Sequence, residues 1–164
     1  MIKKVDHIAI VVKNIEVAAR VYTEALGIPL THIQEQVDDA VRVGFLPVGD
    51  SEIELVEPTS AETGVARFLE RRGEALHHIC LEVDDLDQVL ASLKERGVEL
   101  IDQQPRQGAV GRVAFLHPRA TNGILIELNQ IVEPLPWRQS AGESPAAPAD
   151  EPNSFDISLP PPGA

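Results

Sequence analysis

Residues 5–12 read VDHIAIVV, and residues 76–83 read LHHICLEV. Both stretches alternate between large apolar residues and smaller or polar ones, which is typical of a β-strand with one buried face. Each stretch has a histidine at the matching position, His7 in the first and His78 in the second. This likeness suggests that one structural unit occurs twice in the chain.

The likeness continues along both halves of the chain in the same order. RVGFL at 42–46 matches RVAFL at 112–116, and the tripeptide IEL occurs at 53–55 and again at 126–128. Small differences in spacing between these matches are what loops of different length produce. The sequence therefore contains an internal duplication.

Each copy predicts a strand, a helix and three further strands. Asn14 and Asp85 are good N-caps for the helices, and Gly27 and Gly97 supply the left-handed residue that ends a helix. The remaining strands are expected at 29–34, 40–47 and 52–57 in the first copy and at 99–101, 112–117 and 123–130 in the second. Because one βαβββ unit leaves a sheet face uncovered, we expect the two units to pair.

We therefore predict an α+β fold of two tandem βαβββ modules, at about 2–58 and 75–131, within one domain over 1–132. A short helix at about 63–72 is expected to link the modules. Residues 133–164 carry many prolines among serine, alanine and acidic residues. Such a segment buries too little apolar surface to offset its ordering entropy, so we expect a disordered tail.

The composition argues against several partners. The formal net charge of −12 disfavours binding to nucleic acid or to an anionic membrane through bulk charge. The single cysteine, Cys80, excludes an internal disulfide and fits a reducing compartment. The first apolar run is too short for a signal sequence, and no stretch is long enough to span a membrane. We expect a cytoplasmic protein.

Strand parity predicts which side chains share a surface. Because neighbouring residues of a strand point to opposite faces, His7 and His78 should leave the face under the helix and point to the concave side. The residues expected on the concave face with them are Val5, Ala9, Val11, Leu76, Cys80 and Glu82. By the same rule, Glu54 and Glu127 in the last strand of each copy should point there as well.

These four polar residues are candidates for one shared site. A lone strand histidine is usually structural and a lone Glu54 is usually solvated, but the four occupy equivalent places in both copies. Two imidazoles and two carboxylates suit a divalent transition metal such as Co, Mn, Ni, Fe or Zn, without discriminating among these. Of the other histidines, His32 and His77 are assigned no role, His77 because of its parity. His117 is expected either at the cavity or as a structural residue of a loop end.

The chain resembles the vicinal oxygen chelate superfamily and, within it, the methylmalonyl-CoA epimerases. The resemblance covers residues 2–131 and rests on the ordered motifs DHIAI, IELVEP, LHHICLEVDD, AFLHP and ILIELNQ. It implies a curved mixed sheet around a metal-containing cleft, with a divalent metal ion held by His7, Glu54, His78 and Glu127. It also implies a homodimer and an acyl-CoA substrate. The carbon between the thioester and the carboxylate of this substrate would be inverted, with Glu127 as ligand and catalytic base.

The sequence departs from the family at Val43, where some epimerases carry a second glutamate. A second acid must then come from elsewhere, such as Glu54 or a water. Arg106, Arg112 and Arg119 flank the RQGAVGR loop and the FLHPR turn. They are candidates for contacts with a substrate phosphate or carboxylate, with surface solubility as the alternative.

Three other functions remain open. A glyoxalase-type isomerase would use the same ligands on a glutathione adduct. An extradiol dioxygenase would need two histidines and one carboxylate around iron, and the fourth candidate ligand, Glu54, weighs against it. A metal-free protein that only binds a small molecule would leave the paired histidines and glutamates unexplained.

Overall fold

The computed structural model describes residues 1–108 and 110–132, so the tail predicted at 133–164 lies outside the described residues. The first half contributes β1 (Ile2–Val11), α1 (Ile15–Arg20), a π-helical turn η1 (Val21–Ala25), β2 (His32–Gln36), β3 (Val41–Val48) and β4 (Ser51–Pro58). Helix α2 (Gly64–Arg72) follows. The second half contributes β5 (Ala75–Val83), α3 (Leu86–Glu95), β6 (Arg106–Gln107), β7 (Gly111–Leu116), a 3₁₀ turn η2 (Pro118–Ala120) and β8 (Leu125–Ile131).

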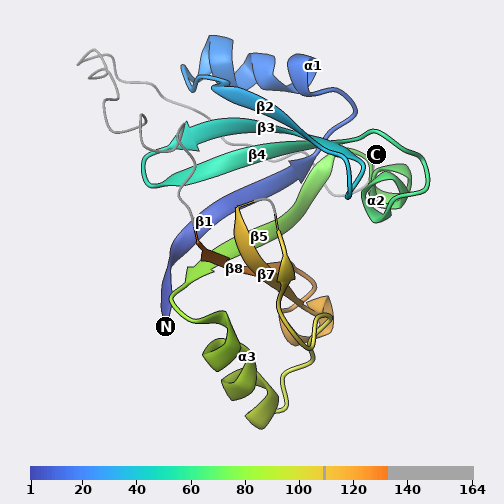
Figure 1. Ribbon diagram of the computed structural model, residues 1–164. Helices are drawn as coiled ribbons and strands as arrows, with labels where there is room; N and C mark the ends of the chain where they lie inside the picture. Colours follow the sequence, from blue (N-terminus) through green and yellow to red (C-terminus); the bar gives the residue numbers. More distant parts are fainter. Residues whose placement is uncertain (109, 133–164) are drawn as a thin grey trace.

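The described strands form one mixed sheet in the order β2-β3-β4-β1-β5-β8-β7-β6. Strands β1 and β5 pair antiparallel at its centre, and each has the last strand of its own half as a parallel neighbour on the other side. The sheet curls, and α1 and α3 lie at opposite ends of the molecule (Figure 1). The predicted α+β fold of two βαβββ units in a curved mixed sheet is confirmed.

The helices begin where the sequence predicts. The side chain of Asn14 accepts a hydrogen bond from the backbone N–H of Val17, and Asp85 does the same for Gln88. These contacts satisfy N–H groups that have no partner within the helix. No helix among the described residues is long and apolar enough to cross a membrane.

Three clusters of buried apolar residues form the hydrophobic core of the two halves. One lies under α1 and contains Val12, Ile15, Ala19, Leu46 and Leu55. A second lies under α3 and contains Val83, Leu86, Leu90, Leu100, Ala114, Leu116 and Leu128. The third contains Ala9, Val11, Val41, Val43, Phe45 and Val56, with Val65, Phe68 and Leu69 of α2 packed on it. Because Ala9 and Val11 share the face of His7, α2 fills part of the concave side, next to the polar residues.

The pairing of β1 with β5 at the central seam has three register shifts, and the two that lie beside the histidines are β-bulges that change the predicted parity. The pairing register of β1 and β5 shifts between Val5 and His7 and again opposite His77, so each strand has one extra residue beside its histidine. Val5 and Leu76 are therefore 39% and 45% exposed, and their predicted place on the concave face was wrong. An extra residue at a bulge breaks the period of two on which the prediction rested.

The edge of the second half also differs from the prediction. The strand expected at 99–101 is only an isolated bridge between Leu100 and Leu116. The N–H groups of Ile101 and Asp102 both donate to the carbonyl of Phe115, so the chain turns there and does not continue the ladder. The edge strand forms later, as β6.

Candidate metal centre and active site

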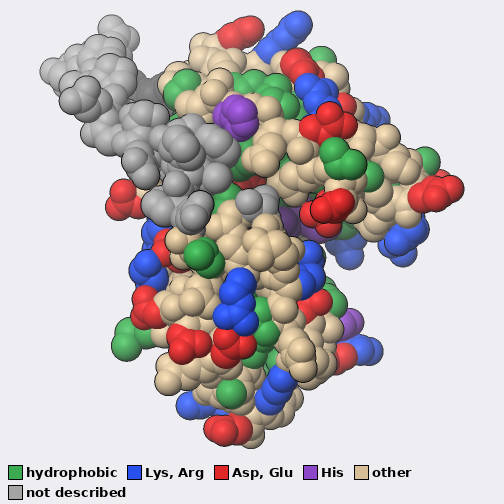
Figure 2. All heavy atoms as spheres, viewed as in Figure 1, with side chains coloured by type: hydrophobic (Ala, Val, Ile, Leu, Met, Phe, Trp, Pro, Cys, Tyr) green, Lys and Arg blue, Asp and Glu red, His purple; other side chains and the backbone are tan. Residues whose placement is uncertain are grey.

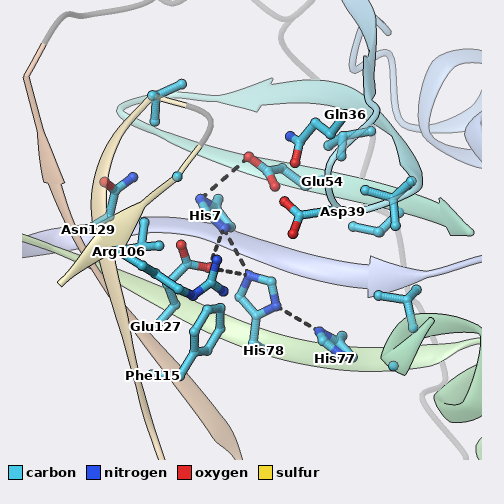
Figure 3. Close-up of a pocket in the computed structure, with 18 of the residues that line it drawn as sticks. His7, Gln36, Asp39, Glu54, His77, His78, Arg106, Phe115, Glu127 and Asn129 are labelled. Carbon is cyan, nitrogen blue, oxygen red and sulfur yellow. Dashed lines mark hydrogen bonds and ion pairs between the residues drawn. The ribbon is translucent and has the colours of Figure 1, made fainter. Parts of the chain in front are cut away.

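Two histidines and one glutamate from three neighbouring strands converge at the centre of the sheet (Figure 3). The Nε2 atoms of His7 and His78 lie 3.1 Å apart. Glu127 Oε2 lies 2.9 Å from the Nε2 atom of His78 and 3.8 Å from that of His7. All three side chains are buried.

These separations fit ligands of one cation. Ligand atoms bound at about 2.1 Å to the same ion, and about 90° apart, lie about 3 Å from one another. His7, His78 and Glu127 form a group whose ligand atoms all lie within 4.8 Å of one another. The residues present therefore fit a divalent metal ion, with two imidazole nitrogens and one carboxylate oxygen as donors.

Glu54 lies on the other side of His7. Its Oε1 atom is 3.5 Å from Nδ1 of His7, which is the ring nitrogen opposite the converging Nε2. The side chain lines the same cavity, but it stands outside the group of three. Its role as the fourth ligand stays a prediction.

Each bulge places a polar side chain behind a histidine. Nδ1 of His7 lies 3.0 Å from Oδ2 of Asp6, to which it can donate, and Asp6 is only 1% exposed. Nδ1 of His78 lies 2.9 Å from Nδ1 of His77, which occupies the equivalent position of the second half. A partner at Nδ1 fixes the tautomer and leaves the Nε2 lone pair for a metal.

Sequence reasoning missed both supporting residues. His77 was set aside on parity, and it does line the cavity. The signal was the pair of polar residues at matching places, DH at 6–7 and HH at 77–78. A bulge carries two consecutive residues to one face, which strict alternation cannot predict.

The electrostatics of the site favour positive charge at its centre. Burial alone would lower the pKa of His7, but the carboxylates of Glu54 and Asp6 outweigh it and raise this pKa well above its ordinary value. Burial alone would raise the pKa of Glu127, and the bonds to His7 and His78 lower it instead. A bound cation would replace the histidine protons as the positive charge that attracts the carboxylates of the site.

The neighbouring groups stay neutral. Burial, together with the charge of His78, lowers the pKa of His77 to about 4, so the Nδ1 atom of its neutral ring can accept a hydrogen bond from Nδ1–H of His78. Burial raises the pKa of the Cys80 thiol to about 12. Cys80 therefore behaves as a small apolar residue behind His7.

A cavity of about 310 Å³ opens beside the three converging residues. Its apolar wall is formed by Val41, Val43, Phe45, Val56 and Val65 on one side and by Val110, Val113 and Phe115 on the other. Asn129 also lines it, is 1% exposed, and its Oδ1 atom has no hydrogen-bond partner among the described residues. The cavity thus joins a polar floor to apolar walls, as small-molecule sites commonly do.

The other residues singled out in the sequence lie in different places. Val43 lines the cavity without an ionisable group. Arg112 and Arg119 form ion pairs with Asp87 and Glu99 away from the cavity lining. His117 is not among the described lining residues, and its Nδ1 atom accepts from the N–H of Arg119. The structural alternative for His117 is therefore the one observed.

Comparisons with known proteins agree with the fold and with the resemblance seen in the sequence. Residues 6–115 match the Glyoxalase/Bleomycin resistance protein/Dioxygenase superfamily. The ethylmalonyl-CoA/methylmalonyl-CoA epimerase of Cereibacter sphaeroides is 38% identical over 80% of this chain and 100% of its own length. The uncharacterized protein YqjC of Bacillus subtilis is 41% identical over 76% of this chain and 90% of its own.

A solved structure supports the same assignment. The methylmalonyl-CoA epimerase from Mycobacterium tuberculosis superimposes with a TM-score of 0.75 at 31% identity, over 80% of this chain and 90% of that one. The resemblance to the methylmalonyl-CoA epimerases is thereby confirmed.

Proposed function

Because the chain belongs to the Glyoxalase/Bleomycin resistance protein/Dioxygenase superfamily, we propose that it is a metal-dependent epimerase that interconverts the (R) and (S) forms of methylmalonyl-CoA. The observation that carries this proposal is the convergence of His7, His78 and Glu127 in a buried cavity. Relatives and structural neighbours that are themselves epimerases support the substrate class.

The donor set is suited to a divalent transition metal such as Co, Mn, Ni, Fe or Zn. Such an ion, held by His7, His78 and Glu127 with Glu54 as fourth ligand, would stabilise negative charge on the thioester oxygen of the substrate. The chain itself holds the metal-ligating atoms in position. Asp6 and His77 orient the two imidazoles from behind.

Glu127 is the group that we assign to proton removal. Its Oε2 atom faces the two imidazoles, so its other carboxylate oxygen is the one assigned to the substrate. The bonds to His7 and His78 lower its pKa and keep it ionised, and an ionised carboxylate is the form that can act as a base. The C2–H bond breaks, the proton passes to Glu127, and the electron pair delocalises onto the thioester oxygen.

Inversion needs a proton from the opposite face of the same carbon. Val43 cannot provide it, since it has no ionisable group. Glu54 is the best placed acid, because β4 and β8 are the outer two of the four central strands and present Glu54 and Glu127 from opposite sides of the histidines. We assign proton return to Glu54.

A deuterium-exchange assay at C2 tests the proposal. Metal-loaded protein in D₂O should exchange the C2 hydrogen of methylmalonyl-CoA and interconvert the two epimers. Glu54→Gln and Glu127→Gln should each lower interconversion by about 10²- to 10⁴-fold, the usual contribution of one acid–base group. Each variant should retain some exchange with only one of the two epimers. If the wild type does not exchange the C2 hydrogen, the proposal is wrong.

Two alternatives are checked with the same preparation. A glyoxalase-type activity would isomerise a glutathione hemithioacetal. The three converging residues also form the two-histidine, one-carboxylate set of iron oxygenases, so oxygen consumption with a catechol and Fe²⁺ would reveal a dioxygenase. We expect neither reaction, because the relative matched over its full length is an epimerase.

We also propose a cytoplasmic homodimer. Val5, Ile8 and Leu76 expose apolar side chains on the outer face of the central seam, between the ends of the sheet covered by α1 and α3 (Figure 1). Apolar side chains gathered on one surface indicate an interface, and a twofold pairing would cover this face on both copies. Ile8→Glu should convert a dimer to a monomer in light scattering.

The lone, buried Cys80 supports a reducing compartment.

A further inference from the structure

The cavity has an excess of acidic side chains. Asp39, Glu54 and Glu127 line it, and Arg106 is the one lysine or arginine among its described lining residues. A substrate that carries a carboxylate would be repelled by such a lining unless positive charge offsets it. Arg106 is the one arginine or lysine of the described lining that can add to the positive charge at the centre of the site.

Arg106 lies close to the converging donors. Its guanidinium carbon is 5.1 Å from the centre of the Phe115 ring, and that ring is 5.7 Å from the ring of His78. Arg106 and the candidate metal ligand His78 therefore both contact the ring of Phe115. In Figure 3, Arg106 points into the cavity on the side of Glu127.

The position of Arg106 is set by the edge of the sheet. Residue Arg106 of β6 pairs with Val113 of β7. Oδ2 of Asp102 accepts from the backbone N–H of Phe115 and lies 3.6 Å from Nε of Arg106. Asp102 is therefore an ion-pair partner of Arg106 through Nε, and we assign the two terminal nitrogens of the guanidinium to a ligand. Their fork matches a carboxylate.

The other two candidate arginines are engaged on the surface. Arg112 donates to both carboxylate oxygens of Asp87, at 2.7 and 3.0 Å, and Arg119 donates through Nε to Glu99 at 3.1 Å. On the face seen in Figure 2, basic and acidic side chains are interspersed. Neither Arg112 nor Arg119 is among the described lining residues of the cavity, so Arg106 is the candidate arginine for recognition.

We propose that Arg106 binds the free carboxylate of a malonyl-type thioester and so selects these substrates over thioesters without a carboxylate. This inference rests on the proposed function and specifies its substrate class. Arg106 lies against Phe115, whose ring contacts that of His78. This position favours the acyl carboxylate over a phosphate of coenzyme A, because the pantetheine arm carries the phosphates far from the thioester.

The test compares three ligands on Co²⁺-loaded protein by calorimetry. Malonyl-CoA differs from acetyl-CoA by the carboxylate, and coenzyme A reports the phosphates alone. Arg106→Gln should weaken malonyl-CoA binding by about 10-fold or more, which corresponds to about 1.4 kcal/mol. Its affinities for acetyl-CoA and coenzyme A should change by less than about 2-fold. Arg106→Lys should show a smaller loss for malonyl-CoA, since it keeps the charge and loses the fork.

Arg112→Gln is the matched control and should bind all three ligands as the wild type does. An equal loss for the three ligands in Arg106→Gln would assign the residue to a phosphate, and an unchanged malonyl-CoA affinity would leave it with no ligand; either result overturns the inference. Metal content and thermal midpoint of each variant show whether it is folded. Wild-type protein that binds malonyl-CoA but does not exchange C2 of methylmalonyl-CoA would refute the proposed function and leave the binding result to decide on Arg106.

Discussion

Asp6 is the residue that best shows how the site is prepared for a metal. Its carboxylate is buried and lies 3.0 Å from Nδ1 of His7. A buried carboxylate requires a partner that can donate to it, and His7 satisfies this requirement only if Nδ1 carries the proton. The Nε2 lone pair is then directed to the centre of the site.

Asp6→Asn should therefore weaken metal binding by about 10- to 100-fold, as is usual for partners of metal-bound histidines. The amide can still accept from His7, so the fold should persist, but it removes the negative charge that makes the imidazole a better ligand. Competition with a chelator of known affinity measures the effect. Asp87→Asn, which breaks the surface pair with Arg112, is the control; an equal loss there would show that Asp6 has no special role.

The four candidate ligands could be found in the sequence because the duplication repeats them. His7, Glu54, His78 and Glu127 all line one cavity. What the sequence could not show is the orientation of each side chain. Glu54 approaches the Nδ1 side of His7, and this depends on how the rings turn, which no spacing in the sequence records. Arg106 could not be told from Arg112 and Arg119 either, since their ion-pair partners are distant in sequence.

At the scale of elements, the helix caps could be predicted from the sequence and the β-bulges could not. The caps at Asn14 and Asp85 need only the next three residues, and the structure confirms both. The bulges at Asp6 and His77 arise where β1 and β5 meet, and these strands are far apart in sequence. Strand pairing therefore decides a feature that neither strand predicts by itself.

Gly111 affects the site through β8, because it lies on β7 where β7 pairs with that strand. A Cβ atom at this position would lie 2.2 Å from the backbone oxygen of Gln130. Gly111→Ala should force β8 to shift, with a loss of about 1 to 3 kcal/mol in the free energy of unfolding. Glu127 lies on β8, so activity should fall as well.

Thermal and urea unfolding measure this loss. Gly64→Ala is a suitable control, since a Cβ there meets nothing within 4 Å and alanine is favoured in a helix. Equal stability of Gly111→Ala and the wild type would mean that the β7–β8 pairing adapts without cost.

For the whole molecule, the sequence sets residues 133–164 apart from the domain. They carry many prolines among serine, alanine and acidic residues, a composition that buries little apolar surface. Truncation after Val132 should therefore leave the thermal midpoint within about 2 °C and the activity nearly unchanged, since surface changes rarely exceed about 0.5 kcal/mol. A large loss in either would show that the removed segment packs on the domain.

The pairing of β1 with β5 is what creates a site that neither half has alone. His7 comes from one half, and His78 and Glu127 come from the other. The proposed reaction therefore depends on a cation held jointly across the seam.

Metal content per chain, measured by elemental analysis after removal of free metal, tests this joint site most directly. We predict about one divalent ion per wild-type chain and nearly none in either His7→Ala or His78→Ala, because three or four protein ligands are the usual complement and each variant loses one. His117→Ala, outside the described cavity lining, should keep its ion. Full retention of metal by either of the first two variants, or epimerisation by metal-depleted wild type, would contradict a cation shared by the two halves.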